Sequence, residues 1–500
     1  MNQRTRTGIS AFTMTSILLA SLAGTPALAQ KSPDAKAGAP KIKPQPSVSD
    51  WDIGAPSMSP TPSRSGTSRA ASAGTASPTP PAQVQGLPAA AEDADPSSTA
   101  QPVVQPVAVL EPVMQWQVAD ARALLTTIQG IKSEGLFPKD YQVDALKAAI
   151  AQGEGDALDQ VASKSFAWLI EDLRDGRTPM TARVQWFAVD PDQDKMPTAQ
   201  VMAQALSNHD IAGVVSQLAP TVPDYAALKQ ALADTPDSQA ARRSLIRVNM
   251  DRWRWLARDL GDVYLLTNVP EFQLRLTVKN RIIRTYKTVV GKPGRTATPQ
   301  LAETVTAVVF NPTWTVPQSI VKGEGLGAKV MASPSWAKAN GYKGIKSADG
   351  TITVVQQPGK NNALGLMKID MPNPHAIYLH DTPSKQFFNA DVRAFSHGCI
   401  RTERAVELGM TMAILGAQMP ADQAADISRS GVYTKVAMTR TFPVYITYVT
   451  MGQAIDGTLT KYADLYGRDA PVLASFAAPR EEKTTQRASE EPIIQLDNPL

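Results

Sequence analysis

The sequence predicts an α+β protein in which a helical domain precedes a mainly β domain with a lid insertion. Two changes of pattern support this class. Apolar residues recur at helical spacing across roughly 107–235, and short runs of alternating apolar and polar residues follow across about 262–455. The chain has 500 residues, more than one ordinary core accommodates. We therefore expect two folded domains flanked by unstructured segments.

The first 29 residues have the pattern of a secretory signal peptide. Arg4 and Arg6 precede an uncharged, mostly apolar stretch at 9–23, and Ala-Leu-Ala at 27–29 matches an A-x-A cleavage site. A transmembrane anchor is the alternative, but the apolar run is short for a bilayer and contains Ser and Thr. We expect cleavage after Ala29 and a periplasmic mature protein without an integral membrane segment.

Residues 30–106 are rich in Pro, Ala, Ser and Thr and show no apolar periodicity. Such a composition cannot bury enough surface to fold, so we expect a disordered linker. The formal net charge of the chain is +4, which is close to neutral for its length. This charge gives no support for a nucleic-acid partner, which usually requires a basic patch or stripe.

The region 107–235 should form a small helical domain without recognisable chemistry of its own. Its one histidine, His209, lies in a polar turn and should face solvent. A connecting helix is expected within 236–261, with Ile246, Met250 and Trp253 on one face. The helical segments predicted before it are Ala119–Glu134, Asp140–Gln152, Val161–Leu173, Gln200–Ala219 and Asp224–Ala233.

The region 262–470 should form the β domain, and residues 471–500, which are polar and charged, should be a disordered tail. Residues 318–360 hold many Gly and Lys with weak periodicity, and a long irregular stretch of this kind is often a functional lid. The predicted strands are Val263–Val269, Gln273–Lys279, Ile282–Val290, Thr304–Phe310, Thr351–Val355, His375–Leu379 and Val444–Val449.

The one cysteine, Cys399, carries the strongest chemical signal. An intramolecular disulfide is impossible, and three of the four histidines, His375, His380 and His397, lie within 25 residues of it. A cysteine nucleophile needs a nearby imidazole to take its proton, and Gly398 allows a close backbone approach. A zinc site and an inert buried cysteine are the alternatives, although one cysteine and this spacing fit no common zinc pattern.

The combination of His380 with Ser396-His397-Gly398-Cys399 resembles the signature of L,D-transpeptidases. Further segments resemble the large Gram-negative subgroup, which carries a helical scaffold domain. Relatives of that subgroup also carry a separate peptidoglycan-binding domain, for which the short interval between Ala233 and Arg242 leaves no room. The resembling segments are 172–177, 311–317, 361–365, 377–385, 393–395 and 466–469.

The resemblance implies a role for each candidate residue and requires no metal or other cofactor. Cys399 would be the nucleophile and His380 the general base, with His397 as the alternative base. Backbone N–H groups around His397, Gly398 and Cys399 would form an oxyanion hole. Residues expected to contact the substrate are Arg401, Tyr378, Ser396 and Trp314, whereas His375 should be structural.

The implied activity is 3→3 cross-linking of peptidoglycan tetrapeptide stems, with release of D-Ala and sensitivity to carbapenems. Hydrolysis of the same thioester, by a carboxypeptidase or amidase, is one alternative. Transfer to a lipoprotein lysine is another, and a wall-binding scaffold with an inert site is a third. Expected partners are the tetrapeptide stems and other cell-wall synthesis proteins. The acceptor, the oligomeric state and the anchoring to the wall are not encoded in any recognisable pattern.

Overall fold

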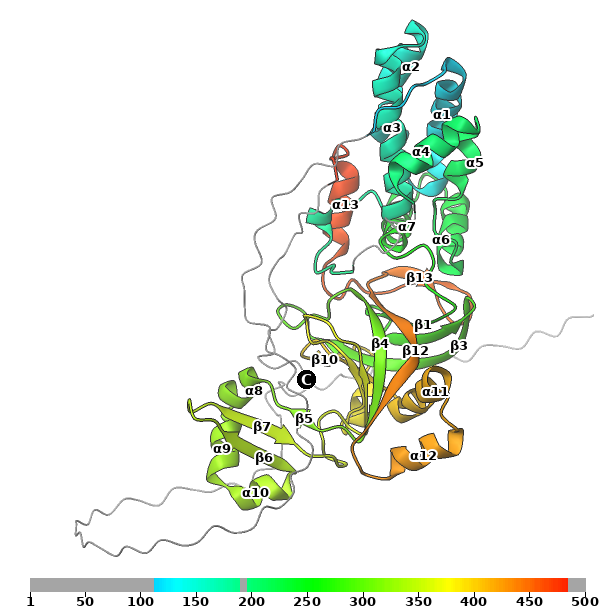
Figure 1. The fold of residues 1–500 in the computed structure, drawn as a ribbon. Coiled ribbons are helices and arrows are strands. Elements are labelled where there is room, and N and C mark those ends of the chain that lie inside the picture. Colours follow the sequence, from blue (N-terminus) through cyan, green and yellow to red (C-terminus); the bar gives the residue numbers. More distant parts are fainter. Residues whose placement is uncertain (1–111, 189–195, 484–500) are drawn as a thin grey trace, which may run out of the picture. The chain divides into compact units, whose positions relative to one another are not determined.

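The structure is a computed structural model, and it describes residues 112–188 and 196–483. All of these residues lie in one compact unit. The predicted fold class is confirmed, since a helical N-terminal region precedes a mainly β region (Figure 1). The predicted signal peptide at 1–29 and the predicted linker at 30–106 lie outside the described residues.

The helical region is built close to its predicted segments, with one difference. The segment expected at 200–219 is two helices, because a turn at 208–210 interrupts it: His209 has a φ of 50°, and the Asp210 carboxylate accepts a hydrogen bond from the Gly213 N–H at 2.8 Å. The helices are α1 (Val118–Gly130), α2 (Val143–Gln152), α3 (Asp156–Asp175), α4 (Thr198–Ser207), α5 (Ile211–Ser216), α6 (Pro223–Asp234) and α7 (Ala240–Arg254).

Helix α7 belongs to the same core as the helices before it, rather than standing apart as a connector. Ile246, Met250 and Trp253 are buried in that core, as their spacing predicts. The helix ends at Arg254, before the end of the predicted segment 236–261. The core extends onto one face of the following sheet, where it includes Tyr264 and Tyr445.

The β region is a nine-stranded sheet in the order β10-β3-β11-β9-β8-β4-β12-β1-β2, and β2 also pairs with β3, so the sheet closes on itself. All residues of β1 are buried, because its alternate side chains enter two different cores. The strands are β1 (Val263–Asn268), β2 (Gln273–Val278), β3 (Arg281–Gly291), β4 (Leu301–Phe310), β8 (Met367–Asp370), β9 (Leu379–His380), β10 (Ala394–Ser396), β11 (Ile400–Thr402) and β12 (Thr434–Thr447).

The prediction of a strand at 375–379 is wrong for most of that segment. Only β9, at Leu379–His380, is a strand, because the Asn373 side chain organises a turn before it and Ala376 adopts a φ of 49°. Two further helices, α11 (Ala405–Ala417) and α12 (Ala421–Arg429), carry no prediction from the sequence. Helix α11 packs on β4, β8 and β12.

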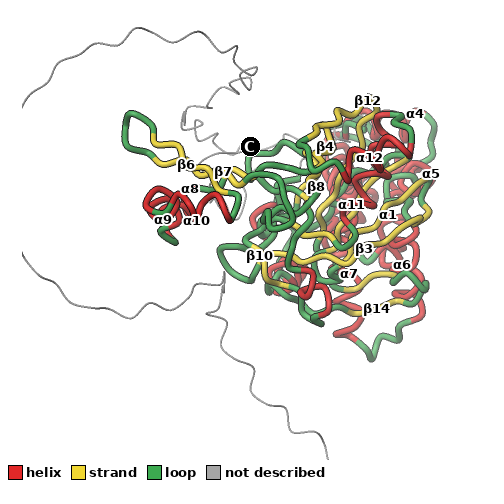
Figure 2. The backbone as a smooth tube through the Cα atoms, turned by 90° about the horizontal axis from the view of Figure 1, so that it is seen from below, coloured by secondary structure: helices red, strands yellow, loops and turns green. Residues whose placement is uncertain are grey.

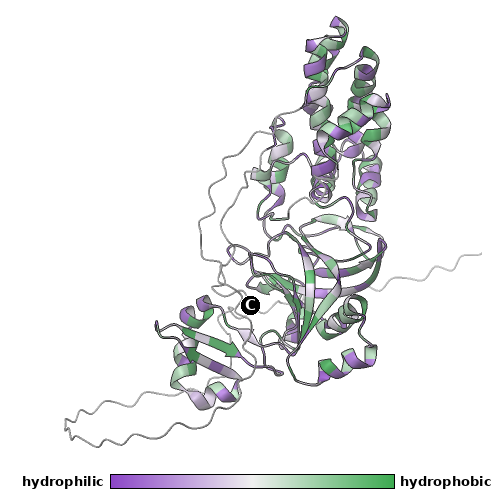
Figure 3. Ribbon diagram, viewed as in Figure 1, coloured by the Kyte–Doolittle hydropathy of each residue, from purple (hydrophilic) through white to green (hydrophobic). Residues whose placement is uncertain are grey.

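The region expected to be irregular is an ordered small subdomain, so that expectation is corrected, while its role as a lid stays a prediction. Its three strands have the order β5-β7-β6. Its helices lie along β6 and β7 (Figure 2), and the ribbon of β7 has the colour of hydrophobic residues (Figure 3). Five buried side chains form a core of their own: Val316, Val321, Val330, Ala337 and Val354. Its elements are β5 (Trp314–Thr315), α8 (Gln318–Gly323), α9 (Leu326–Ala332), α10 (Pro334–Ala339), β6 (Tyr342–Lys346) and β7 (Ile352–Gln356).

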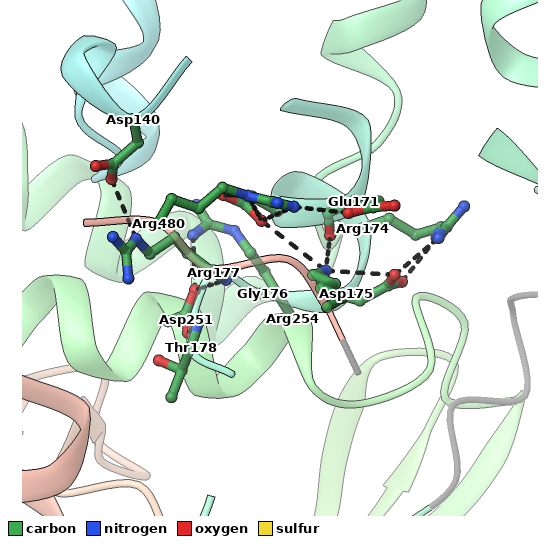
Figure 4. Close-up of polar contacts among 12 residues, drawn as sticks. Asp140, Glu171, Arg174, Asp175, Gly176, Arg177, Thr178, Asp251, Arg254 and Arg480 are labelled. Atoms are coloured by element: carbon green, nitrogen blue, oxygen red, sulfur yellow. Dashed lines mark hydrogen bonds and ion pairs between the residues drawn. The ribbon is translucent and has the colours of Figure 1, made fainter. Parts of the chain in front are cut away.

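The expected disordered tail from 471 is also corrected over 471–483. After the hairpin β13 (Met451–Gln453) and β14 (Leu459–Lys461), helix α13 (Asp469–Ala477) packs on α7. The segment that follows α13 is bound to the helical region. Arg480 pairs with Glu171 (Figure 4) and with Asp172. Arg177 donates to the carbonyl oxygens of Ser475 and Ala478 at 2.6 and 2.8 Å. Residues 484–500 lie outside the described part.

Candidate active site

The register of two adjacent strands brings four of the predicted site residues onto one face of the sheet. Strands β9 and β11 are parallel, with Ile400 paired to Leu379 and Arg401 paired to His380. Leu379 and Ile400 are fully buried in the core beneath the sheet. Because successive side chains of a strand point to opposite faces, His380 and Arg401 face away from that core.

Cys399 and Tyr378 are on the same face as His380 and Arg401, two residues earlier in the two chain segments. The pairing of these segments continues to Tyr378, because the Ile400 N–H donates to the Tyr378 carbonyl at 3.0 Å. The rings of Tyr378 and His380 lie 5.5 Å apart between centroids, on the same side of the strand. Cys399 therefore lies beside Tyr378, as Arg401 lies beside His380, and the four side chains form one block.

The Cys399 side chain is half-buried, and its sulfur donates to the carbonyl oxygen of Ala376 at 3.6 Å. Burial raises the pKa of the Cys399 thiol, while hydrogen bonding by Tyr378 and the positive charges of Lys368 and Arg401 act in the opposite direction without cancelling it. The resting thiol is therefore protonated at neutral pH. Its activation requires a base that takes the proton as the reaction proceeds.

His380 is buried, and its Nδ1 lies 2.5 Å from the carbonyl oxygen of Asp381. A carbonyl only accepts, so Nδ1 carries the proton and Nε2 is left as the basic nitrogen. Burial lowers the pKa of His380 to about 3, and the charge of Arg401 is the next largest cause. The imidazole is thus neutral and able to accept a proton at every physiological pH.

The segment that holds His380 is itself fixed by the Asp381 carboxylate. This group accepts from the Leu366 N–H at 2.9 Å and pairs with Lys385. Gly365 approaches it so closely that an added Cβ would lie 2.4 Å from the carboxylate oxygen. The glycine of the Asn-Asn-Ala-Leu-Gly segment at 361–365 is therefore required by space as well as by its φ of 63°.

Arg401 is a largely buried cation on the reactive face. Its guanidinium lies 5.7 Å from the centroid of the Phe387 ring. Burial lowers the pKa of Arg401, and the Cys399 thiol is the one group that opposes this shift. Among the described residues no carboxylate forms an ion pair with Arg401, whereas Arg174 and Arg177 of the helical region each pair with an aspartate. The arrangement suits an anionic group supplied by another molecule.

Ser396 and Gly398 shape the turn before the nucleophile. The Ser396 hydroxyl donates to the Cys399 carbonyl at 2.6 Å and accepts from the Gly398 N–H at 3.2 Å. Ser396 is only 2% exposed, which leaves it little surface for the predicted contact with substrate. The Gly398 N–H is already used inside the protein, which differs from its predicted place in an oxyanion hole. His397 is exposed beside this turn.

The predicted residue Trp314 lies in β5 of the small subdomain and is half-buried. The pKa of Tyr378 is raised well above its ordinary value, chiefly by burial, while Trp314 acts in the opposite direction. Trp314 is therefore close to the Tyr378 side chain, as its predicted place in the site requires. His375 lies outside this block, with its ring 4.0 Å from that of Phe187.

Sequence reasoning missed one cation of the site, Lys368. It is paired with His380 across β8 and β9 and is 7% exposed. Its ammonium lies 4.6 Å from the centroid of the Tyr378 ring and 2.9 Å from Asp370. Lys368 stands between the apolar residues Met367 and Ile369, which is the alternation of a strand. This weak signal is the only one in the sequence that could have pointed to Lys368.

Sequence reasoning also missed Thr298, which is fully buried and donates to the Gly398 carbonyl at 2.8 Å.

Within residues 112–188 and 196–483, no group of three or more His, Cys, Asp or Glu side chains is placed to hold a metal ion. Over the same residues, no helix combines the length and apolar character needed to cross a bilayer.

Comparison with known proteins assigns both parts of the chain. Residues 262–410 match the L,D-transpeptidase catalytic domain, and residues 114–232 match the scaffold domain. A Haemophilus influenzae protein named "Putative L,D-transpeptidase" is 24% identical over 375 residues, which make up 71% of this chain and 75% of that protein.

Solved structures resemble a smaller part of the chain. The Ldtfm–avibactam carbamoyl enzyme is 15% identical, with a TM-score of 0.20, over 37% of this chain and 49% of that one. An L,D-transpeptidase from Mycobacterium smegmatis is 14% identical, with a TM-score of 0.19, over 37% of this chain and 58% of that one. This chain thus spans about half of the length of the solved structures that it matches. The chain therefore combines a region that matches the L,D-transpeptidase catalytic domain with a preceding region that matches the scaffold domain.

Proposed function

We propose that this protein is a peptidoglycan L,D-transpeptidase that forms 3→3 cross-links between stem peptides through a thioester on Cys399. One observation carries the proposal. The parallel register of β9 and β11 puts Cys399, Tyr378, His380 and Arg401 on one face, and it combines a neutral imidazole with an arginine that forms no ion pair with a carboxylate of the described chain. A nucleophile, a base and an anion site are the parts that acyl transfer to a charged peptide needs.

In the first half-reaction, the Cys399 sulfur attacks the carbonyl between residues three and four of a tetrapeptide stem. The Cys399 proton passes to Nε2 of His380. The new sulfur–carbon bond forms, the amide carbon–nitrogen bond breaks, and His380 returns the proton to the departing amine of D-Ala. In the second half-reaction, the side-chain amine of another stem attacks the thioester. Its proton passes through His380 back to the Cys399 sulfur as the cross-link forms.

The backbone N–H of Cys399 is our candidate for stabilising the oxyanion of each tetrahedral intermediate. The Gly398 N–H is occupied by the Ser396 hydroxyl. The Cys399 N–H donates no hydrogen bond within the described part of the chain. A nucleophile's own N–H lies close to the carbonyl oxygen that the nucleophile attacks, and losing such a donor typically costs about 10²–10³ in rate.

Arg401 would bind a carboxylate of the stem, and Tyr378 and Trp314 would line the site at the lid. Water competes with the acceptor amine for the thioester, so closure of the lid over the site would favour transfer over hydrolysis. The alternative functions would use the same catalytic residues and the same thioester. In a carboxypeptidase or amidase the acceptor would be water, and in the third case it would be a lipoprotein lysine. Export to the periplasm, with a signal peptide removed after Ala29, completes the proposal.

The test is mass spectrometry of purified disaccharide-tetrapeptide after incubation with the mature protein. A dimer lighter than two monomers by one D-Ala is the expected product, and Cys399→Ser should yield none with its fold intact. Tripeptide alone would bring the hydrolase forward. Cross-linking by Cys399→Ser would overturn the nucleophile assignment. His380→Ala and His397→Ala serve as a matched pair, because only the first should abolish turnover.

A further inference from the structure

A buried hydroxyl holds the peptide unit that joins Gly398 to Cys399. Thr298 is fully buried, and its hydroxyl accepts from the Gly291 N–H at 2.9 Å. The same hydroxyl donates to the Gly398 carbonyl at 2.8 Å, across 100 residues of sequence. With its one proton directed at Gly398, the hydroxyl cannot rotate to another partner without leaving a buried polar group unsatisfied.

The direction of this carbonyl sets the direction of the next N–H. In a trans peptide unit, the C=O and the N–H point to opposite sides. The Gly398 carbonyl points into the protein at Thr298, so the Cys399 N–H of the same unit points away from Thr298. On its other side, the Cys399 carbonyl is held by the Ser396 hydroxyl at 2.6 Å. Both peptide units that flank the reactive residue are therefore fixed by side chains.

We propose that Thr298 is a positioning residue that aims the Cys399 N–H at the oxyanion formed during acyl transfer. This inference rests on the proposed role of Cys399 as nucleophile. Thr298 does not touch the substrate. It acts by preventing rotation of the 398–399 peptide unit, which Gly398 would otherwise permit because glycine adopts its φ of 122° without a side-chain penalty. A rotated unit would present a carbonyl oxygen where the N–H is required.

Thr298 is itself held in place from two sides. The Tyr466 hydroxyl donates to the Gly291 carbonyl at 2.7 Å and accepts from the Thr298 N–H at 3.3 Å, and Arg468 donates to the Thr298 carbonyl at 3.2 Å. Gly291 packs so tightly on the loop that an added Cβ would lie 1.9 Å from the Thr296 carbonyl oxygen. The hydroxyl therefore has a fixed base from which to direct the Gly398 carbonyl.

Two reactions of the Cys399 sulfur distinguish a misdirected N–H from a displaced thiol. Acylation by a carbapenem adds Cys399 to a carbonyl, opens the lactam carbon–nitrogen bond and transfers the thiol proton to the lactam nitrogen, so it passes through an oxyanion. Alkylation by iodoacetamide displaces iodide, and no oxyanion forms. A misdirected Cys399 N–H should slow the first reaction and leave the second unchanged, whereas a displaced or buried thiol should slow both.

The experiment measures both rate constants for the full mature chain and for its variants Thr298→Val, Thr298→Ser and Thr296→Val. The probes are imipenem, followed by its loss of absorbance and by the adduct mass, and iodoacetamide. Thr298→Val should lower the acylation rate about 10- to 100-fold with unchanged alkylation, since the donor is misdirected and not deleted. Thr298→Ser, which restores the hydroxyl, should recover most of the rate. Thr296→Val removes a hydroxyl from the same loop, one that donates to the Lys292 carbonyl at 3.3 Å and not to Gly398, so it should change acylation little.

Equal acylation by Thr298→Val and the unchanged protein would overturn the proposal. So would a parallel loss of both reactions, which would mean that the thiol has moved, or a loss in Thr298→Ser as large as in Thr298→Val. If Thr298→Val does not fold, Thr298→Ala takes its place: it should slow acylation but not alkylation, Thr298→Ser should not, and equal acylation by Thr298→Ala and Thr298→Ser would overturn the proposal. Failure of the unchanged protein to be acylated at Cys399 would instead reject the proposed function.

Discussion

Arg401 lies directly beside His380, on the adjacent parallel strand and in register with it. Its positive charge disfavours the imidazolium form and, after burial, is the largest cause that lowers the pKa of His380 to about 3. The thiol of Cys399 is shifted upward by burial. Both shifts favour a neutral thiol and a neutral imidazole at rest, rather than a thiolate–imidazolium pair.

The first prediction follows from these two directions. The neutral thiol and neutral imidazole coexist from above the pKa of His380 to below that of Cys399, so the rate of acylation by imipenem should be nearly independent of pH between 5 and 8.

Arg401→Gln removes the charge that disfavours imidazolium, so the pKa of His380 should rise. The loss of acylation rate at acid pH should then begin closer to neutral pH. Arg404→Gln is the control, because that arginine is half-exposed and pairs with Glu407. Such a loss near pH 6.5 in the unchanged protein would contradict the assignment.

The second prediction concerns the carboxylate that Arg401 would bind. Hydrogen bonds to charged groups contribute about 1.5–3 kcal/mol, so Arg401→Gln should lower kcat/KM for a tetrapeptide stem by roughly 10- to 150-fold. Stems in which single carboxylates are amidated would be compared in the same assay. The variant and the unchanged protein should differ least for the stem that lacks the bound carboxylate. An equal difference for every amidated stem would mean that Arg401 binds none of them.

Local sequence pattern is sufficient to predict those elements in which the periodicity extends over many residues. Strands β2 and β4 are predictable because apolar residues alternate along them, as Leu274 and Leu276 do in β2. Strand β9 has two residues and β8 has four, which is too short for a period to be recognised. Their existence depends on pairing with β11 and β4, and pairing partners are not visible in a single sequence.

The residues of the candidate site also fall into two groups, those that a local sequence pattern reveals and those that only a long-range contact reveals. Cys399, His380 and Arg401 lie in or near one contiguous motif, and strand alternation alone relates Tyr378 to His380. Thr298 could not be found, because its role depends on a contact with Gly398 that is 100 residues away. The polar C-terminal segment was expected to be disordered for a related reason. Charged residues indicate exposure only when their counter-charges are not provided elsewhere in the fold.

The third prediction tests that segment. Arg480 is 8% exposed and lies 2.6 Å from the Glu171 carboxylate (Figure 4). It also lies 3.2 Å from the Asp172 carboxylate, and its guanidinium is 4.3 Å from the centroid of the Trp168 ring. Arg480→Met should leave two buried carboxylates without this partner and should lower the free energy of unfolding by about 3–5 kcal/mol. Chemical denaturation of the mature protein would measure this change.

The matched control for this change is Arg429→Met. Arg429 pairs with Asp426 at 2.9 Å, but the two side chains are 73% and 76% exposed. A solvated pair contributes little, so this variant should unfold close to the unchanged protein. Similar stability of the two variants would show that the C-terminal segment contributes no more to the fold than a surface ion pair does.

The last prediction concerns Glu303, a half-buried residue of β4 that the proposed mechanism does not use. Burial alone raises the pKa of Glu303 to about 7, above its ordinary value of 4.5. Below pH 4.5 the carboxyl is protonated in both the folded and the unfolded chain, and its titration has no effect on stability. Between the two pKa values the unfolded chain ionises first, so stability should fall as the pH rises from about 4.5 to 7 and should then level off.

Glu303→Gln replaces the titrating group by a neutral one of similar size. The variant should match the unchanged protein near pH 4.5 and exceed it at pH 8 by on the order of 1 kcal/mol, a value reduced from the full pKa shift because the side chain is half-exposed and screened by solvent. Thermal or denaturant unfolding at the two pH values measures the difference. Because other groups titrate identically in both proteins, only the difference between them reports on Glu303. A difference that is the same at both pH values would mean that the carboxyl ionises normally in the folded protein and that its burial carries no energetic cost.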